Sequence, residues 1–205
     1  MTAATIDVVI VDSGGANLAS LQFALDRLGA RSVVSTDVET IRGAPRVLLP
    51  GVGSAQDAMA RLRANGLDRI LPGLRQPVLG ICLGMQLLYE RSEEGDTPCL
   101  GIIAGCVSRL QPACGLPVPH MGWNRIRARR EDALLDGLGE GERVYFVHGF
   151  AAPVTAETVA VTDHGTDFTA VVRRENFSGT QFHPERSGPC GARILDNFLR
   201  RVPCS

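Results

Sequence analysis

The chain has 205 residues, enough for one domain with a substantial hydrophobic core. Its 21 basic and 22 acidic side chains nearly cancel, so its charge indicates binding neither to nucleic acid nor to an anionic membrane. No apolar run approaches the roughly 20 residues of a membrane-spanning helix, and the amino terminus lacks the pattern of a signal peptide. We therefore expect a single cytoplasmic domain over residues 1–205.

The six cysteines would suffice for three disulfides, but a chain of this size without a secretory signal favours reduced thiols. The sequence also lacks Cys-x-x-Cys and His-x-x-x-His pairs, which structural zinc sites commonly use. We expect no metal, no cofactor and six reduced cysteines, which are Cys82, Cys99, Cys106, Cys114, Cys190 and Cys204.

Over residues 6–90, short apolar strands alternate with helices, which is typical of a parallel sheet with helices on both faces. Strands are predicted at 6–11, 31–35, 46–49 and 77–81, and helices at 18–28, from 55 after the N-cap Ser54, and after 66. Functional loops of such sheets follow the carboxyl ends of the strands. We therefore expect segments 12–17 and 50–53 to share one edge with the segment around Cys82.

The glycine-rich segment 12–17 has neither the spacing of a dinucleotide-binding loop nor that of a P-loop. On residue type alone, Asn17 fits a helix cap or a loop contact better than a cofactor ligand. This loop therefore does not by itself indicate a bound phosphate.

The second half contains shorter extended runs separated by turn residues, at 101–110, 144–147, 158–163, 168–174 and 179–182. We expect these strands to be partly antiparallel and partly an extension of the parallel sheet. Residues 192–201 have the apolar spacing of a closing helix. The predicted fold class is α/β, with a mostly parallel central sheet, helices on both faces and an antiparallel extension.

The segment Gly80-Ile81-Cys82-Leu83-Gly84 follows an apolar strand, and the spacing of Met85–Tyr89 predicts a helix after it. Glycines two residues before and after Cys82 remove the side chains that would clash when a strand turns sharply into a helix. This pattern is a nucleophile elbow that carries a thiol. A helix amino terminus would favour the thiolate, and the backbone N–H of Leu83 could stabilise an oxyanion. The alternative is a buried structural cysteine.

A general base for this thiol is present in Gly179-Thr180-Gln181-Phe182-His183-Pro184-Glu185, at the end of another predicted strand. Histidine can take a proton from a thiol and return it to a leaving group. Glu185 lies two residues from His183 in an extended segment, so its carboxylate can orient the ring. Alone, His183 could be an ordinary strand-end histidine and Glu185 a solvated charge, but the elbow makes both alternatives less attractive.

The loop Pro50-Gly51-Val52-Gly53 ends the strand predicted to lie beside the elbow. Two glycines around one side chain give the backbone freedom to point an N–H at a substrate carbonyl oxygen. We expect an oxyanion hole here, with an ordinary βα turn as the alternative.

The segments Gly80–Gln86 and Gln181–Glu185 together resemble the class I glutamine amidotransferases, which are glutaminases with a Cys-His-Glu triad. Within that class, four further segments resemble the glutaminase subunits of imidazole glycerol phosphate synthases: 50–53, 119–124 (Pro-His-Met-Gly-Trp-Asn), 145–148 and 183–187. The resemblance runs from Ile6 to about Leu199. It implies a flavodoxin-like fold and hydrolysis of glutamine to glutamate and ammonia through a cysteine thioester.

The resemblance also implies the roles of individual residues. Cys82 would be the nucleophile, His183 the acid and base, and Glu185 the residue that orients His183. The oxyanion hole would be formed by the backbone of Gly51, Val52, Gly53 and Leu83, and glutamine would be held by Gln86, Glu94, Gly149 and Phe150. Glu93 is the alternative to Glu94, since a carboxylate at either position suits the substrate ammonium.

In the family, ammonia passes to a (β/α)₈ synthase subunit that makes imidazole glycerol phosphate and an aminoimidazole carboxamide ribotide in histidine biosynthesis. The resemblance implies a heterodimer with such a subunit, through Asn17, Trp123, Tyr145 and Arg186. From the residues alone, Trp123 would be placed in the core, because a single Trp is more often buried than at an interface. The resemblance reverses this interpretation, since partner surfaces favour aromatic anchors.

The chain departs from the family at Gly149-Phe150, where a Ser or Thr followed by Tyr is usual. A hydroxyl contact to glutamine would be lost there, and Gly149 should loosen the strand. Three alternative functions remain: a glutaminase that feeds another synthase, such as that for pyridoxal phosphate; a cysteine peptidase; and a non-catalytic binding subunit.

Overall fold

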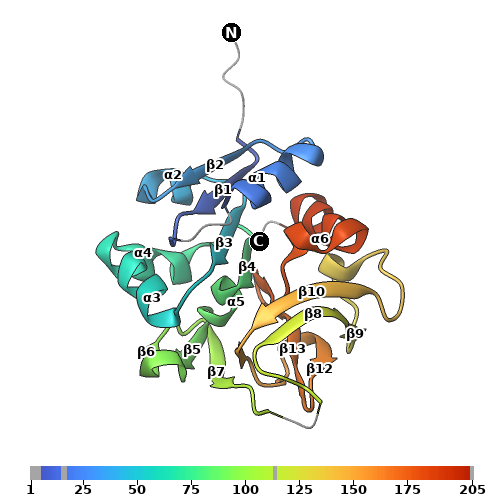
Figure 1. The fold of residues 1–205 in the computed structure, drawn as a ribbon. Coiled ribbons are helices and arrows are strands. Elements are labelled where there is room, and N and C mark those ends of the chain that lie inside the picture. Colours follow the sequence, from blue (N-terminus) through green and yellow to red (C-terminus); the bar gives the residue numbers. More distant parts are fainter. Residues whose placement is uncertain (1–5, 15–17, 113–114, 204–205) are drawn as a thin grey trace.

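An eight-stranded mixed sheet forms the centre of the computed structural model, which describes residues 6–14, 18–112 and 115–203 (Figure 1). The strand order is β2-β1-β3-β4-β14-β13-β12-β9. Strands β2 to β14 in this order are parallel, and β13, β12 and β9 continue the sheet antiparallel. The strands are β1 (Val8–Val11), β2 (Ser32–Ser35), β3 (Val47–Gly51), β4 (Val78–Cys82), β9 (Arg127–Ala128), β12 (Thr158–Asp163), β13 (Asp167–Arg174) and β14 (Phe177–Thr180). This arrangement confirms the predicted fold class.

Two smaller sheets accompany the central one in the described part of the chain. The first has the order β11-β7-β5-β6, and the second is the antiparallel pair of β8 and β10. Their strands are β5 (Tyr89–Ser92), β6 (Thr97–Pro98), β7 (Ile103–Arg109), β8 (His120–Arg125), β10 (Arg143–His148) and β11 (Phe150–Ala151). In Figure 1 the β8–β10 pair lies beside α6, and α3 and α4 lie at the opposite side of the molecule.

The helices are α1 (Leu18–Arg27), α2 (Val38–Arg42), α3 (Ala55–Ala64), α4 (Leu67–Ile70), α5 (Leu83–Gln86) and α6 (Gly188–Arg200). Short 3₁₀ turns are η1 (Leu71–Gly73), η2 (Glu94–Asp96), η3 (Ala133–Leu135) and η4 (Pro184–Arg186). Ser54 caps α3 as predicted, because its hydroxyl accepts the backbone N–H of Asp57 at 3.1 Å. None of the described helices has the length and apolar character needed to cross a membrane.

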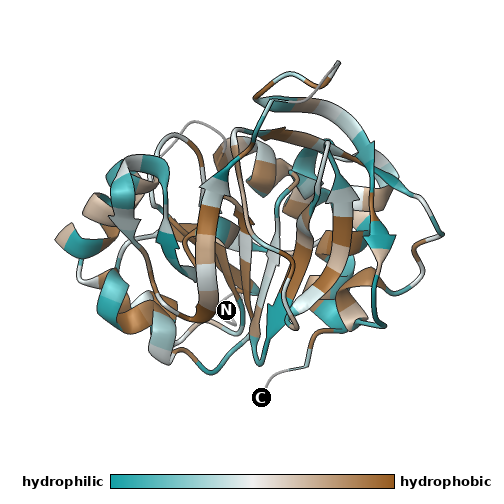
Figure 2. Cartoon of the chain, turned by 90° about the horizontal axis from the view of Figure 1, so that it is seen from below, coloured by the Kyte–Doolittle hydropathy of each residue, from teal (hydrophilic) through white to brown (hydrophobic). Residues whose placement is uncertain are grey.

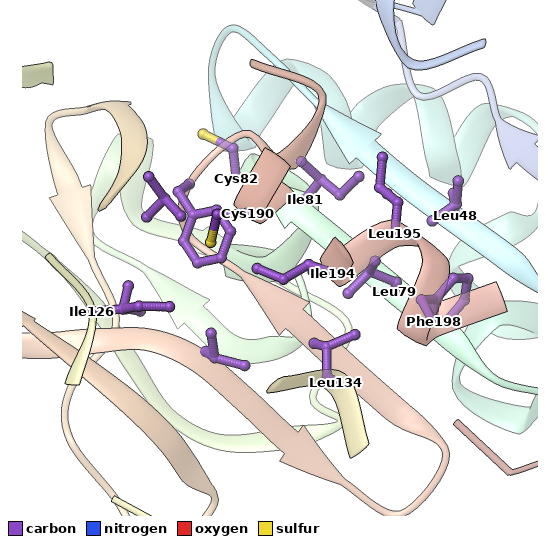
Figure 3. Packing of buried hydrophobic residues seen from close by; sticks show 14 of the residues in the cluster. Leu48, Leu79, Ile81, Cys82, Ile126, Leu134, Cys190, Ile194, Leu195 and Phe198 are labelled. Carbon is purple, nitrogen blue, oxygen red and sulfur yellow. The ribbon is translucent and has the colours of Figure 1, made fainter. Parts of the chain in front are cut away.

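Successive side chains of the parallel strands point to opposite faces of the sheet, so the sheet divides the interior into two cores. Val8 and Ile10 face the core that includes α1 and α6, whereas Val9 and Val11 face the core beneath α2, α3 and α4. Because both faces of the sheet are covered, the parallel strands β1 and β4 are buried along their whole length. Figure 2 shows the apolar stretches of the strands and the polar outer faces of the helices. Figure 3 shows the first core, where Ile194, Leu195 and Phe198 of α6 pack near β3 and β4.

Two local predictions were wrong. The helix expected over Met85–Tyr89 is only the single turn of α5, because Tyr89 already pairs with Ile103 in the β5–β7 ladder. Tertiary pairing therefore overrides the helical spacing. The strand expected through Phe182 ends at Thr180, which leaves 181 and 182 outside the ladder.

Helix α2 was missed, although Asp37 accepts the Thr40 N–H at 2.8 Å and Gly43 ends the helix. The Asp before an apolar residue and the Gly six positions later were the available signals. The four cysteines that the structure describes have free thiols, while Cys114 and Cys204 lie outside the described residues.

The end of β3 and the start of α5 approach so closely that they exclude side chains. A Cβ placed on Gly84 would lie 1.7 Å from the Leu49 carbonyl oxygen, and one on Gly80 would lie 2.7 Å from the Gly84 oxygen. A Cβ on Gly51 would lie 3.0 Å from the Gly84 nitrogen. The elbow glycines are therefore required by backbone packing.

Replacement of Gly84 by Ala should destabilise the fold by at least about 3 kcal/mol, because backbone atoms of β3 would have to move. Gly73→Ala is the matched control, since a Cβ there meets nothing within 4 Å. Urea unfolding of both variants measures the difference. Equal free energies of unfolding for the two variants would contradict the steric explanation.

Candidate functional site

Cys82 ends β4 in a backbone conformation that residues with a side chain rarely adopt, with φ 53° and ψ −110°. Such strain persists only where the surrounding structure enforces it, and here the enforcing contact is the packing of β3 against α5. The residue lies at the edge of the first core, and its sulfur points away from Ile81 and Leu195 (Figure 3). The structure thus presents the thiol as a nucleophile elbow does.

The sulfur of Cys82 has polar neighbours from two other segments. The ring of His183 is near enough for Cys82 to raise the pKa of the imidazole, and the side-chain nitrogen of Gln181 lies 3.8 Å from the sulfur. The carbonyl oxygen of Val147 in β10 is 3.9 Å from the sulfur. Residues about a hundred positions apart in the sequence therefore converge on one sulfur atom.

His183 and Glu185 form the second pair of the site. The Nδ1 of His183 lies 2.9 Å from the Oε1 of Glu185, and both side chains are almost fully buried. Burial of the ring acts to lower the pKa of His183, but the hydrogen bonds and charges of Cys82 and Glu185 outweigh it and raise that pKa from 6.5 to about 10. The imidazolium form of His183 is therefore favoured at neutral pH.

Ser187 ties the His183 segment to β10. Its hydroxyl donates to the His183 carbonyl at 2.7 Å and accepts the Tyr145 N–H at 2.9 Å. The N–H of His183 donates to the Tyr145 carbonyl at 3.0 Å. Sequence reasoning gave Ser187 no role, although it lies in the segment 183–187 that carries the resemblance.

The loop Pro50–Gly53 lies beside the elbow as expected, because Gly51 is the register partner of Cys82. Gly53 has φ +92°, and Val52 is partly exposed. The hydroxyl of buried Ser13 donates to the Pro50 carbonyl at 2.6 Å, which fastens this loop to the end of β1. The backbone of Leu83 begins α5 directly after the thiol. The candidate oxyanion groups are thus adjacent to Cys82.

The candidate glutamine-binding residues surround the same region. Buried Gln86 donates both N–H groups within the protein, to the Phe150 carbonyl at 2.8 Å and to the Gln181 side-chain oxygen at 3.0 Å. Among the described residues, no hydrogen bond involves its oxygen, which remains suited to a substrate ammonium. Gly149 separates β10 from β11, and a Cβ there would meet nothing within 4 Å, so a Ser or Thr would fit.

The neighbouring carboxylates of Glu93 and Glu94 accept hydrogen bonds from different segments of the chain. Glu94 accepts the N–H of Ala55 at 2.7 Å, at the start of the helix that follows the loop 50–53. Glu93 accepts the N–H of Arg109 at 2.8 Å, on β7. Glu94 is therefore the carboxylate nearer to the loop 50–53.

A buried chain of imidazoles, which sequence reasoning missed, supports the same segment. The Nδ1 of His148 lies 2.8 Å from the Phe150 carbonyl, which can only accept, so this nitrogen carries the proton. The Nε2 of His148 must then accept from the Nδ1 of His120 at 3.0 Å, and the Nε2 of His120 accepts from Asn124 at 3.2 Å. Both rings are neutral in this arrangement.

Burial explains why these rings stay neutral. It lowers the pKa of His148 from 6.5 to about 3, and burial with the nearby His164 lowers the pKa of His120 to about 4. The aromatic ring of Phe146 stacks on His120 at 4.8 Å between centroids. The only signals for this cluster in the sequence were the histidines of segments 119–124 and 145–148.

The sequence of residues 9–202 matches the family model described as glutamine amidotransferase class-I. The chain belongs to the class I glutamine amidotransferases. It is 58% identical over 193 residues, 94% of this chain and 96% of the relative, to the imidazole glycerol phosphate synthase subunit HisH of Xanthomonas oryzae. The subunit HisH of Xylella fastidiosa is 54% identical over the same shares of both chains.

Solved structures of glutamine amidotransferases share the fold. One from Thermotoga maritima has a TM-score of 0.69 at 13% identity and covers 98% of this chain and 99% of its own. Another has a TM-score of 0.73 at 19% identity, with 94% and 96% covered. At these identities the likeness concerns the fold alone.

The residues of this amidotransferase that we expected at a partner interface lie on its surface where the structure describes them. Trp123 on β8 is 54% exposed and meets the half-buried Tyr145 of β10 edge-on, at 6.1 Å between ring centroids. Arg186 is exposed on η4. The alternative that Trp123 belongs to the core was therefore wrong. Asn17 lies outside the described residues.

The free energy of unfolding should fall as the pH is lowered from 6.5 towards 4. In this range the unfolded chain protonates His120 and His148, whereas the folded amidotransferase keeps them neutral, so acid favours unfolding. His148→Phe should make the slope shallower, by up to about 1.4 kcal/mol per pH unit. Urea unfolding at several pH values measures both slopes, and an identical slope in the variant would contradict the assignment.

Proposed function

We propose that this amidotransferase hydrolyses glutamine through Cys82, His183 and Glu185 and passes the ammonia to a (β/α)₈ synthase subunit. The observation that carries the chemistry is the 2.9 Å contact of His183 with Glu185, on a ring whose pKa is also raised by Cys82. The identity to HisH subunits over 94% of the chain supports the pathway. The single domain would act in the cytoplasm, where its thiols stay reduced.

In the first half of the reaction, the Cys82 sulfur forms a bond to the side-chain amide carbon of glutamine. The carbonyl oxygen becomes an oxyanion, for which the backbone N–H groups of Val52 and Leu83 are the proposed donors. The carbon–nitrogen bond then breaks, and the imidazolium of His183 gives its proton to the departing nitrogen. Ammonia leaves, and a glutamyl thioester remains on Cys82.

In the second half, His183 takes a proton from water as the water oxygen attacks the thioester carbon. The carbon–sulfur bond breaks, glutamate leaves, and the sulfur returns as a thiolate beside the imidazolium. Glu185 keeps the ring in one orientation and stabilises its charge. The oxygen of Gln86 and the carboxylate of Glu94 would receive the substrate ammonium, and the backbone of Gly149 and Phe150 would border the substrate.

The proposed docking surface is the outer face of the β8–β10 pair. Met121 and Trp123 of β8 lie opposite Val147 and Tyr145 of β10, and Met121 is 63% exposed. Two of these side chains, Tyr145 and Val147, belong to the strand whose Val147 carbonyl lies 3.9 Å from the Cys82 sulfur. A barrel subunit seated there would cover the site, receive the ammonia and release imidazole glycerol phosphate and an aminoimidazole carboxamide ribotide.

Cys82→Ala should abolish glutaminase activity, and Cys106→Ala, on β7, should retain it. Glu185→Gln should lower the turnover rate by about 10²- to 10⁴-fold, because His183 loses its charged partner. Its slower second step should let the glutamyl thioester on Cys82 accumulate, which mass spectrometry after an acid quench detects with labelled glutamine. Full activity of Cys82→Ala, or thioester formation from a peptide instead of glutamine, would refute the proposed chemistry.

Addition of the barrel synthase subunit and its ribonucleotide should increase glutamate release, since the loop around Val52 would align only in the complex. Trp123→Ala should weaken assembly by about 30-fold, or about 2 kcal/mol, while Trp123→Phe restores part of the loss. Val154→Ala, an exposed apolar residue outside the pair, is the control. Calorimetry and glutamate release measure the effects. Turnover by the isolated subunit as fast as in the full complex would contradict activation by the partner.

A further inference from the structure

Two side chains from the segment after β14 lie beside the Cys82 sulfur, and the proposed triad includes only one of them, His183. The other is Gln181, which is fully buried and whose side-chain nitrogen lies 3.8 Å from the sulfur. A buried primary amide has two N–H donors that need acceptors, so its position beside a thiol calls for an explanation.

The direction of this contact follows from the neighbouring hydrogen bonds. The Phe150 carbonyl can only accept, so the side-chain nitrogen of Gln86 must face it. The same nitrogen lies 3.0 Å from the side-chain oxygen of Gln181, which takes its second N–H. The nitrogen of Gln181 is therefore the atom that faces Cys82.

We propose that Gln181 is a catalytic residue whose amide N–H donates to the Cys82 sulfur and stabilises its thiolate. A donor beside an anion favours the charged form, and such bonds are stronger than those between neutral groups. Gln86 is a positioning residue, since it holds the oxygen of Gln181 and so prevents that oxygen from facing the sulfur. This role is separate from its proposed contact with the substrate.

The two donors to the sulfur also have separate tasks. His183 gives its proton away when ammonia leaves and takes another from water, so its charge changes during the reaction. Gln181 cannot titrate, and its N–H remains available to the sulfur when the thiolate is regenerated. The amide thus stabilises the sulfur anion in the step in which it becomes the leaving group of the thioester.

This inference rests on the proposed function, but alkylation tests it without glutamine. Iodoacetamide is applied to the full chain over a range of pH, and the rate is read by mass spectrometry on the tryptic peptide 76–91, in which Cys82 is the sole cysteine. Gln181→Met keeps the volume but loses the donor. It should move the midpoint of the rate profile up by about one pH unit and slow alkylation at neutral pH about tenfold, with rates converging at alkaline pH.

Two further variants and a control separate this role from packing. Gln181→Glu keeps the acceptor for Gln86 but places a carboxylate at the sulfur, so its midpoint should rise further than that of Gln181→Met. Gln86→Met, which frees the Gln181 amide to turn, should give a smaller rise. Ser178→Ala is the matched control on β14, because the buried Ser178 hydroxyl has no hydrogen-bond partner in the described structure. Thermal unfolding verifies that each variant is folded.

A profile of Gln181→Met or Gln181→Glu that coincides with that of Ser178→Ala would overturn the proposal. Slower alkylation by the same factor at every pH would also overturn it, because that result indicates altered access to the thiol. If Cys82→Ala kept its glutaminase activity, the proposed function would fail, whereas the alkylation profiles would still decide whether Gln181 stabilises the thiolate.

Discussion

The carbonyl oxygen of Phe150 determines the direction of the hydrogen bonds around Cys82. It accepts from the side chains of Gln86 and His148, both at 2.8 Å. Because a carbonyl cannot donate, each partner must turn an N–H towards it, and the next member of each chain is then determined as well. One chain ends with the Gln181 N–H at the Cys82 sulfur, and the other ends at Asn124, which also donates to the Asp163 carbonyl at 2.9 Å.

This arrangement leaves the rings of His120 and His148 neutral, whereas the ring of His183 carries a charge. His120 and His148 are neutral because each ring has one nitrogen that donates and one that accepts, and because burial disfavours the second proton that would charge the ring. His183 is buried to a similar degree but has the Cys82 sulfur and the Glu185 carboxylate beside it, and its pKa is raised instead. Partners, more than burial, therefore distinguish the histidine that carries charge from those that do not.

The sequence predicted the features that depend on residue types at short spacing. The strained Cys82 was predictable because Gly80 and Gly84 flank it, and the His183–Glu185 pair because two positions of extended chain bring both side chains to one side. The cap by Ser54 was predicted from residue types in the same way, and the alternation of strands and helices predicted the parallel direction of the first strands.

Features that depend on contacts between distant segments were not predictable in this way. Tyr89 has helical spacing to its neighbours, but its pairing with β7 decides its conformation. Trp123 could not be assigned to the core or the surface before its strand was known, because one step along β8 exchanges the buried face for the exposed one. The donor direction at Gln181 needed the Phe150 carbonyl, which is supplied by a strand 31 residues earlier in the chain.

Side chains of strand β10 alternate between the outer face and the interior, and this alternation connects the outer surface to the surroundings of Cys82. Tyr145 and Val147 turn their side chains towards the outer face, whereas Phe146 and His148 are buried. The backbone carbonyls of the two outward residues nevertheless reach inward, to the His183 N–H at 3.0 Å and to within 3.9 Å of the Cys82 sulfur. A subunit that pressed on these side chains would act on the peptide groups that align both members of the cysteine–histidine pair. Ser187 adds a second connection between the two segments, because its hydroxyl accepts the Tyr145 N–H and donates to the His183 carbonyl.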